Sequence, residues 1–146
     1  MQPAATPAGF IQDAVTLLAA AEFTLNRATG PSLPVYFLLA RSIELSLKAF
    51  LLDTGMSPKE LAGTHAYGHN LFALHAEALK RNISAKVTLD RIEVGVLDLL
   101  SKEYVGTKLG YRISGGTYLL PLIDATEQVA RKLVHVLEFG AVEINK

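Results

Sequence analysis

The sequence contains no cysteine, and it has no excess of either charge sign. Without cysteine, disulfide bonds, zinc–thiolate sites and thiol chemistry are excluded. The 14 Lys and Arg residues balance the 14 Asp and Glu residues, so the formal net charge of the 146-residue chain is zero. A neutral chain lacks the basic excess that drives nonspecific binding to nucleic acid, although local basic clusters remain compatible with it.

Long apolar runs are also missing. No run approaches the roughly 20 residues that a membrane span needs. The start, MQPAATPAGF, has no basic region ahead of an apolar run, so we expect no secretory signal. These features predict a soluble, cytoplasmic protein with no membrane partner. No cofactor is predicted, because the glycine-rich stretch GTKLGYRISGG does not end in the Gly-Lys-Ser/Thr of a phosphate loop.

What the sequence does contain is enough apolar residues for a core. Half of the chain is hydrophobic, which suits a single domain over residues 1–146 with a loose N-terminus at 1–7. Apolar residues at helical spacing predict an all-α, up-and-down bundle of four or five helices. The predicted helices cover 8–28, 34–54, 71–82, 89–104 and 121–140, with one short turn between 56 and 63. A glycine-rich loop or small hairpin at 106–120 is expected before the last helix.

Residues suited to helix ends support these boundaries. Thr6, Asn70 and Thr88 are predicted N-caps, and Gly55 is a predicted left-handed stop. The inner face of the fourth helix is predicted from its spacing. Its members are Leu89, Ile92, Val96, Leu99 and Leu100.

The second helix carries three charges among apolar neighbours. Arg41, Glu44 and Lys48 follow steps of three and four residues, so they share one face. Apolar residues cover most of the remaining circumference, which predicts a central and deeply buried helix. The charged face has two interpretations: a narrow solvent strip with an exposed ion pair, or a polar site walled by the bundle. In the second case the partners would come from loops, with His65, His69, Tyr111 and Arg112 as candidates.

The order of three short motifs resembles a known family. ARSIELSLKAFLLDTG is followed by YGHNLFAL and later by LGYRISGG. This arrangement resembles the HEPN superfamily (higher eukaryotes and prokaryotes nucleotide-binding domains), small stand-alone bacterial type, over about Ala40 to Ala130. Many small members share a Glu-x-x-x-Lys helix, then Gly-His-Asn/Asp-Leu at the next helix, and a Tyr-Arg element before the last. The matching positions are Glu44, Lys48, Gly68, His69, Asn70 and Arg112.

The resemblance implies a helical bundle that usually forms a homodimer and has links to RNA or nucleotides. Members often act in toxin–antitoxin or phage-defence systems, which would add an antitoxin-type protein partner. One departure concerns catalysis. Catalytic members carry an Arg followed after four to six residues by a His, whereas Arg131-Lys-Leu-Val-His135 is one residue too short. A solvated face of the last helix explains these two residues without chemistry.

Three functional hypotheses follow. The first is a binding module for a nucleotide or RNA segment, with ligand-binding residues Arg41, Glu44, Lys48, His69, Asn70, Tyr111 and Arg112. The second is a metal-independent endoribonuclease with a displaced catalytic pair, His69 and Arg112. The third is a non-catalytic protein-interaction module. The pair His65-x-x-x-His69 has metal-ligand spacing, but flanking glycines disfavour a helix there, and no metal is predicted.

Overall fold

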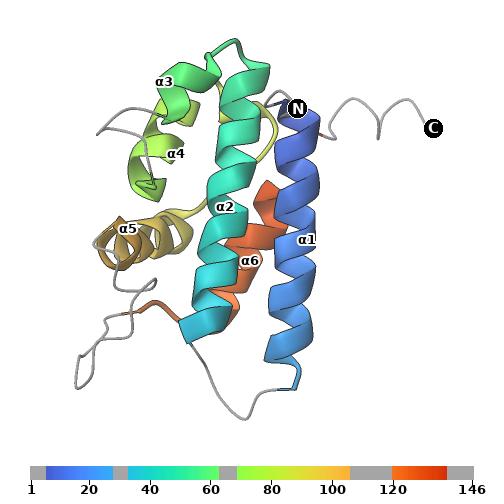
Figure 1. The fold of residues 1–146 in the computed structure, drawn as a ribbon. Coiled ribbons are helices and arrows are strands. Elements are labelled where there is room, and N and C mark those ends of the chain that lie inside the picture. Colours follow the sequence, from blue (N-terminus) through green and yellow to red (C-terminus); the bar gives the residue numbers. More distant parts are fainter. Residues whose placement is uncertain (1–5, 28–32, 63–68, 106–119, 138–146) are drawn as a thin grey trace, which may run out of the picture.

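The computed structural model describes residues 6–27, 33–62, 69–105 and 120–137 (Figure 1). Within these ranges the secondary structure is helical, which confirms the predicted all-α bundle. The helices are α1 (Pro7–Leu25), α2 (Leu33–Asp53), α3 (Pro58–Ala62), α4 (Leu71–Lys80), the 3₁₀ helix η1 (Ile83–Ala85), α5 (Arg91–Val105) and α6 (Ile123–Leu133). The predicted glycine-rich loop or hairpin at 106–120 falls almost entirely outside the described residues.

Helix α2 is the centre of the bundle. It lies antiparallel beside α1, with α6 packed behind the pair and α4 on its other side, while α5 is steeply inclined to them (Figure 1). Leu39, Ile43 and Leu47 are fully buried, and Phe50 is 2% exposed. The prediction that this helix is central and deeply buried is therefore confirmed. Burying each such side chain contributes about 1.5–3 kcal/mol to folding.

Several helix ends form as their residues predict. Thr6 Oγ1 accepts a hydrogen bond from Gly9 N at 3.0 Å, so α1 begins at Pro7 with Thr6 as its cap. At the end of α2, Gly55 adopts φ +109°, a conformation that glycine reaches without a Cβ clash. Met56 N then donates to Leu51 O at 3.1 Å, as in a Schellman stop.

The fourth predicted helix departs from expectation in two ways. Asp90, rather than Thr88, caps α5, because Asp90 Oδ1 accepts from Glu93 N at 2.8 Å. Val96 and Leu100 of the predicted inner face are buried, as are Glu93 and Leu97, whereas the predicted inner residue Ile92 in the first turn is 72% exposed. In this first turn it is Glu93 that reaches α6, where it bonds to Lys132 and Gln128.

The start of α6 is held to α2 by a buried hydrogen bond. Tyr36 Oη donates to the carbonyl oxygen of Pro121 at 2.6 Å. Burial raises the pKa of the Tyr36 hydroxyl above its ordinary value of 10.0. The helix itself begins at Ile123, two residues after the predicted opening at Pro121, and its last residue is Leu133.

Helix α1 carries apolar side chains on the face that points away from the bundle. Its length and mean hydropathy of 1.2 would suffice for a membrane span, and only 17% of that apolar window is buried. Core helices of soluble proteins can have the same length and apolar composition. Here α1 packs along α2. The outward face nevertheless carries Val15 at 43% exposure and Phe23 at 59%.

Candidate functional site

The Glu44 carboxylate is fully buried near the middle of α2. Leaving a charge in such a place without partners would cost several kcal/mol. Lys48 Nζ lies 2.7 Å from Glu44 Oε2, and Arg41 Nη1 lies 3.0 Å from Oε1. His69 Nδ1 lies 3.0 Å from Oε2. The structure therefore brings together four of the predicted site residues, which we call the Glu44 cluster.

The Glu44 cluster runs from the core to the surface. Glu44 has no exposed side-chain area, and Lys48 is 12% exposed. Arg41 and His69 are 39% and 59% exposed. The buried carboxylate thus orients donors whose outer parts reach solvent. This geometry excludes the interpretation of the charged face as a narrow strip of exposed ion pairs.

Asn70 has a role that the sequence also predicted. Its Oδ1 accepts from Ala73 N at 3.0 Å and caps α4. That cap fixes the backbone next to His69 and so holds the imidazole over Glu44. Asn70 therefore positions His69, and its side-chain oxygen already accepts the hydrogen bond of the helix cap.

Three further candidates cannot be placed. Tyr111 and Arg112 lie in the segment 106–119, and His65 lies in 63–68, both outside the described residues. Where side chains are described, no group of three His, Cys, Asp or Glu residues could hold a metal ion.

Arg131 is exposed on α6, and His135 is exposed in the turn that follows this helix, consistent with the solvated polar face that was expected. Arg131 Nε lies 2.6 Å from Glu22 Oε2 and Nη2 lies 3.1 Å from Glu127 Oε2. Both residues line a shallow groove of about 530 Å³, which we call the α6 groove. Its remaining lining residues are Asp124, Glu127, Gln128 and Lys132.

Glu127 of the α6 groove interacts with a second carboxyl group, that of Glu22 on α1. A hydrogen bond between Glu22 and Glu127 raises the pKa of Glu127 and lowers the pKa of Glu22. The Arg131 guanidinium favours the charged form of both carboxylates. The groove is thus organised by ion pairs that link α1 to α6.

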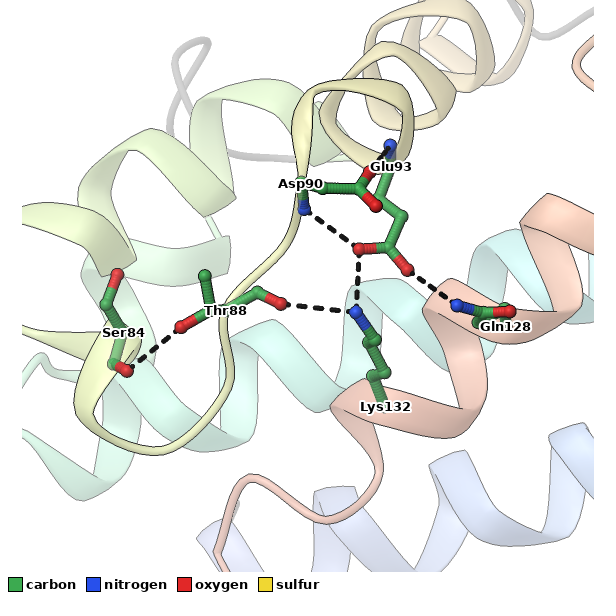
Figure 2. A network of polar contacts seen from close by, with 6 residues as sticks. All are labelled: Ser84, Thr88, Asp90, Glu93, Gln128 and Lys132. Atoms are coloured by element: carbon green, nitrogen blue, oxygen red, sulfur yellow. Dashed lines mark hydrogen bonds and ion pairs between the residues drawn. The ribbon is translucent and has the colours of Figure 1, made fainter.

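A second buried carboxylate, that of Glu93, was not predicted from the sequence. Glu93 is 3% exposed, and its Oε1 accepts from Lys132 Nζ at 2.8 Å and from Asp90 N at 2.9 Å. Its Oε2 accepts from Gln128 Nε2 at 3.1 Å (Figure 2). The available signal was Asp90-x-x-Glu93, which is a reciprocal capping pattern with Asp in place of Ser or Thr.

Thr88 belongs to the same network without capping the helix. Its hydroxyl donates to Ser84 O at 3.2 Å, and its carbonyl accepts from Lys132 Nζ at 3.3 Å (Figure 2). The network joins the start of α5 to α6. Since its buried polar groups satisfy one another, we assign it to structure.

The fold and the Glu44 cluster together define an all-α helical bundle with a buried carboxylate that organises basic side chains. Comparisons with protein-family models, curated proteins and solved structures find no match for the chain. The similarity to the HEPN superfamily therefore rests on the motifs themselves and stays a prediction.

Proposed function

We propose that the protein is a HEPN-like binding module for a nucleotide or an RNA segment. The observation that carries this proposal is the buried Glu44 carboxylate with Arg41, Lys48 and His69 around it. Arg and Lys are the side chains that bind phosphate by charge-assisted hydrogen bonds. The ion pairs with the buried Glu44 carboxylate already restrict these long side chains. Less conformational entropy is therefore lost when a ligand binds to them.

The anchor also explains why a neutral protein can bind an anion locally. Arg41 and Lys48 bring two positive charges to one buried negative charge. Arg41 keeps 39% of its side chain exposed, so a phosphate can approach it from solvent. Binding through a few local contacts requires no overall basic charge.

The test is equilibrium binding of a labelled single-stranded RNA of mixed sequence, followed by fluorescence anisotropy at several salt concentrations. Arg41→Gln and Lys48→Gln keep a hydrogen-bond donor for Glu44 but remove a positive charge. Each should weaken binding and lower the slope of log affinity against log salt by about 0.7 for one lost phosphate contact. Lys102→Gln, on α5 and 67% exposed, is the matched control and should leave that slope unchanged.

A purely structural role for the Glu44 cluster gives a different result. In that case Arg41→Gln and Lys48→Gln lower the melting temperature without changing the salt slope. Wild-type protein that binds neither RNA nor nucleotides would exclude the proposed function and leave the protein-interaction module as the best alternative.

One observation favours endoribonuclease activity as a second candidate. Glu44 Oε2 lies 3.0 Å from His69 Nδ1, so in a neutral imidazole Nδ1 carries the proton and Nε2 presents a lone pair. Carboxylates orient catalytic histidines in this way, and a base within reach would remove the proton of a ribose 2′-hydroxyl. Cleavage of a mixed RNA pool that is lost in His69→Ala and persists with EDTA would establish this activity.

We also propose that the protein forms a homodimer, as the resemblance implies. The support in this structure is the outward face of α1, where Val15 and Phe23 are exposed. Exposed apolar area of this kind is commonly covered by a second copy. An antitoxin-type protein is the alternative partner for this face, and copurification would identify it.

A further inference from the structure

Helix α1 lies at the edge of the bundle, and one side of it points away from the other helices (Figure 1). Its inward side is buried through Ala14, Leu18 and Ala21. The opposite side is exposed, with Phe23 near its middle at 59% exposure and Val15 at one border at 43%. We call this surface the α1 face. Its members are Gln12, Asp13, Val15, Thr16, Ala19, Ala20, Phe23, Asn26 and Arg27.

The centre of the α1 face is built for close contact with another helix. Ala19 and Ala20 are exposed and small, so the backbone of a second helix can approach them. The Thr16 hydroxyl donates to Gln12 O at 3.0 Å, so it keeps a hydrogen-bond partner when water is excluded. The α1 face can therefore be buried without leaving this hydroxyl unsatisfied.

The two large apolar side chains of the α1 face are placed symmetrically about Ala19. Val15 lies four residues before it and Phe23 lies four residues after it. If two copies of α1 pair in antiparallel orientation about a twofold axis at Ala19, Phe23 of each copy meets Val15 of the other. Such a contact is self-complementary, as a twofold interface requires.

The charged residues of the α1 face have the same symmetry. Asp13 lies seven residues before Ala20, and Arg27 lies seven residues after it. This centre is one residue from Ala19, which is about 1.5 Å along the helix axis. One twofold axis therefore serves both pairs, and it brings Asp13 of each copy to Arg27 of the other.

We infer that two copies of the chain pair through the α1 face in antiparallel orientation, with the twofold axis at Ala19 and Ala20. This inference rests on the proposed homodimer and assigns its interface, orientation and register. It does not depend on the binding of RNA, because the Glu44 cluster lies on α2 and contributes no residue to the α1 face.

The charges favour the antiparallel orientation over the parallel one. Parallel helices in register would place Asp13 beside Asp13 and Arg27 beside Arg27, and like charges across an interface repel. Antiparallel helices pair them with opposite charges instead. Arg27 is held ready for this, because its guanidinium lies 3.7 Å from the centroid of its own Phe23 ring. Its Nη1 donates to Phe23 O at 3.2 Å, and a guanidinium has further N–H donors for a carboxylate.

Disulfide trapping tests the register directly, because the chain has no cysteine of its own. After mild oxidation, Ala19→Cys should give a covalent dimer, since the two copies of this residue meet at the axis. Gln12→Cys and Asn26→Cys lie seven residues on either side of Ala19. An equimolar mixture of these two variants should give at least about threefold more covalent dimer than either variant alone. Ala76→Cys, exposed on α4, is the matched control and should remain monomeric on a nonreducing gel.

A charge swap tests the ion pairs by sedimentation velocity at several protein concentrations. Asp13→Arg and Arg27→Asp should each weaken the dimer about fivefold to tenfold, because two attractive contacts become repulsive. The double variant with both substitutions should restore most of the wild-type affinity. Asp98→Arg, on the exposed side of α5, is the control and should leave the dimer unchanged. Circular dichroism identifies any variant that does not fold.

The outcomes that overturn the inference differ in what they say about the other proposals. If the wild type is a dimer but Gln12→Cys and Asn26→Cys each link to themselves as well as to one another, the helices are parallel and only the orientation assigned here is wrong. If the wild type is a dimer and Ala19→Cys gives no covalent dimer, the interface lies elsewhere. A monomeric wild type would exclude both the homodimer and this interface, and flotation of that monomer with phosphatidylcholine vesicles would assign the α1 face to a membrane surface. RNA binding, measured separately by anisotropy, decides the proposed function in each case.

Discussion

His69 Nδ1 lies 3.0 Å from Glu44 Oε2, although the two residues are 25 positions apart. The contact joins the beginning of α4 to the middle of α2. It depends on two local features of the sequence: an acidic residue on an otherwise apolar helix, and an Asn70 cap that fixes the chain beside His69. The Glu44 carboxylate is therefore both a structural anchor and the organiser of a polar surface.

Removing the Glu44 carboxylate should destabilise the protein. In Glu44→Ala the partly buried Lys48 loses its ion partner. We expect a loss of about 3 kcal/mol in the free energy of unfolding, at the low end of the range for broken buried pairs. The loss is not larger because Arg41 and His69 can turn to solvent. Urea unfolding of Glu44→Ala and Glu44→Gln measures it.

Asp98→Asn is the matched control for the Glu44 variants. Asp98 pairs with Lys102 at 3.4 Å on the exposed side of α5, and such a pair contributes less than about 0.5 kcal/mol. If both Glu44 variants lost less than about 1 kcal/mol, the carboxylate would not be the anchor described here.

Ser46→Ala should stabilise the protein. Ser46 Oγ is buried on α2 and has no hydrogen-bond partner among the described residues. Removing an unsatisfied buried hydroxyl relieves a desolvation cost of about 1 kcal/mol. The control is Ser42→Ala on the same helix, because Ser42 Oγ donates to Ala14 O at 2.7 Å. That variant should lose about 1 kcal/mol, and equal effects in both would contradict this account.

Asp90→Ala should cost more stability than Thr88→Ala. Asp90 supplies the cap of α5 through its bond with Glu93 N, and loss of a cap costs about 0.5–2 kcal/mol. The Thr88 hydroxyl makes an exposed bond to Ser84 O, so its removal should cost less than about 0.5 kcal/mol. Chemical unfolding of the two variants measures the difference, and the reverse order would restore Thr88 as the cap.

His75 should make the protein less stable in acid. The side chain is 4% exposed in α4, and burial lowers its pKa below the ordinary value of 6.5. Below pH 6.5 His75 binds a proton in the unfolded chain but remains neutral in the folded chain. The free energy of unfolding therefore falls as the pH drops from 6.5 toward the lower pKa of the folded state. His75→Gln removes this titration. The stability difference between wild type and variant should change between pH 7.5 and 5, and a constant difference would contradict the prediction.

The homodimer can be tested through α1. Light scattering at micromolar concentration should give about twice the chain mass of 15.7 kDa. Placing a carboxylate on the outward face, as in Phe23→Asp, should shift the protein toward the monomer because the charge would be desolvated in the interface. The exposed Thr24→Asp, one position away, is a control for charge alone. A monomeric wild-type protein at that concentration would contradict the prediction.

The fold was largely predictable because helical spacing and end signals act locally. Apolar coverage of α2 predicted its central place, and Thr6, Asn70 and Gly55 marked helix ends through bonds within a few residues. Within α5, Val96 and Leu100 were correctly predicted as buried, whereas Ile92 in the first turn is exposed and its neighbour Glu93 is buried. The Glu93 carboxylate accepts hydrogen bonds from Lys132 and Gln128 of α6. The periodicity of α5 contains no information about these contacts with another helix.

The candidate site was predictable to the same extent. Glu44 could be singled out because a carboxylate on a buried helix requires partners, and His69 was among the candidates. The selection of His69 depends on how α4 docks against α2, which the sequence pattern alone does not define.

The most direct test of the central claim is a side-chain NMR titration of the full chain with single-stranded RNA. If the Glu44 cluster is the binding site, the Arg41 Nε–H, Lys48 Nζ and His69 ring resonances should shift together and saturate at one affinity. In Lys48→Gln the same shifts should require more RNA. Shifts confined to Arg131, Lys132 and His135 would instead place binding at the α6 groove and contradict the account.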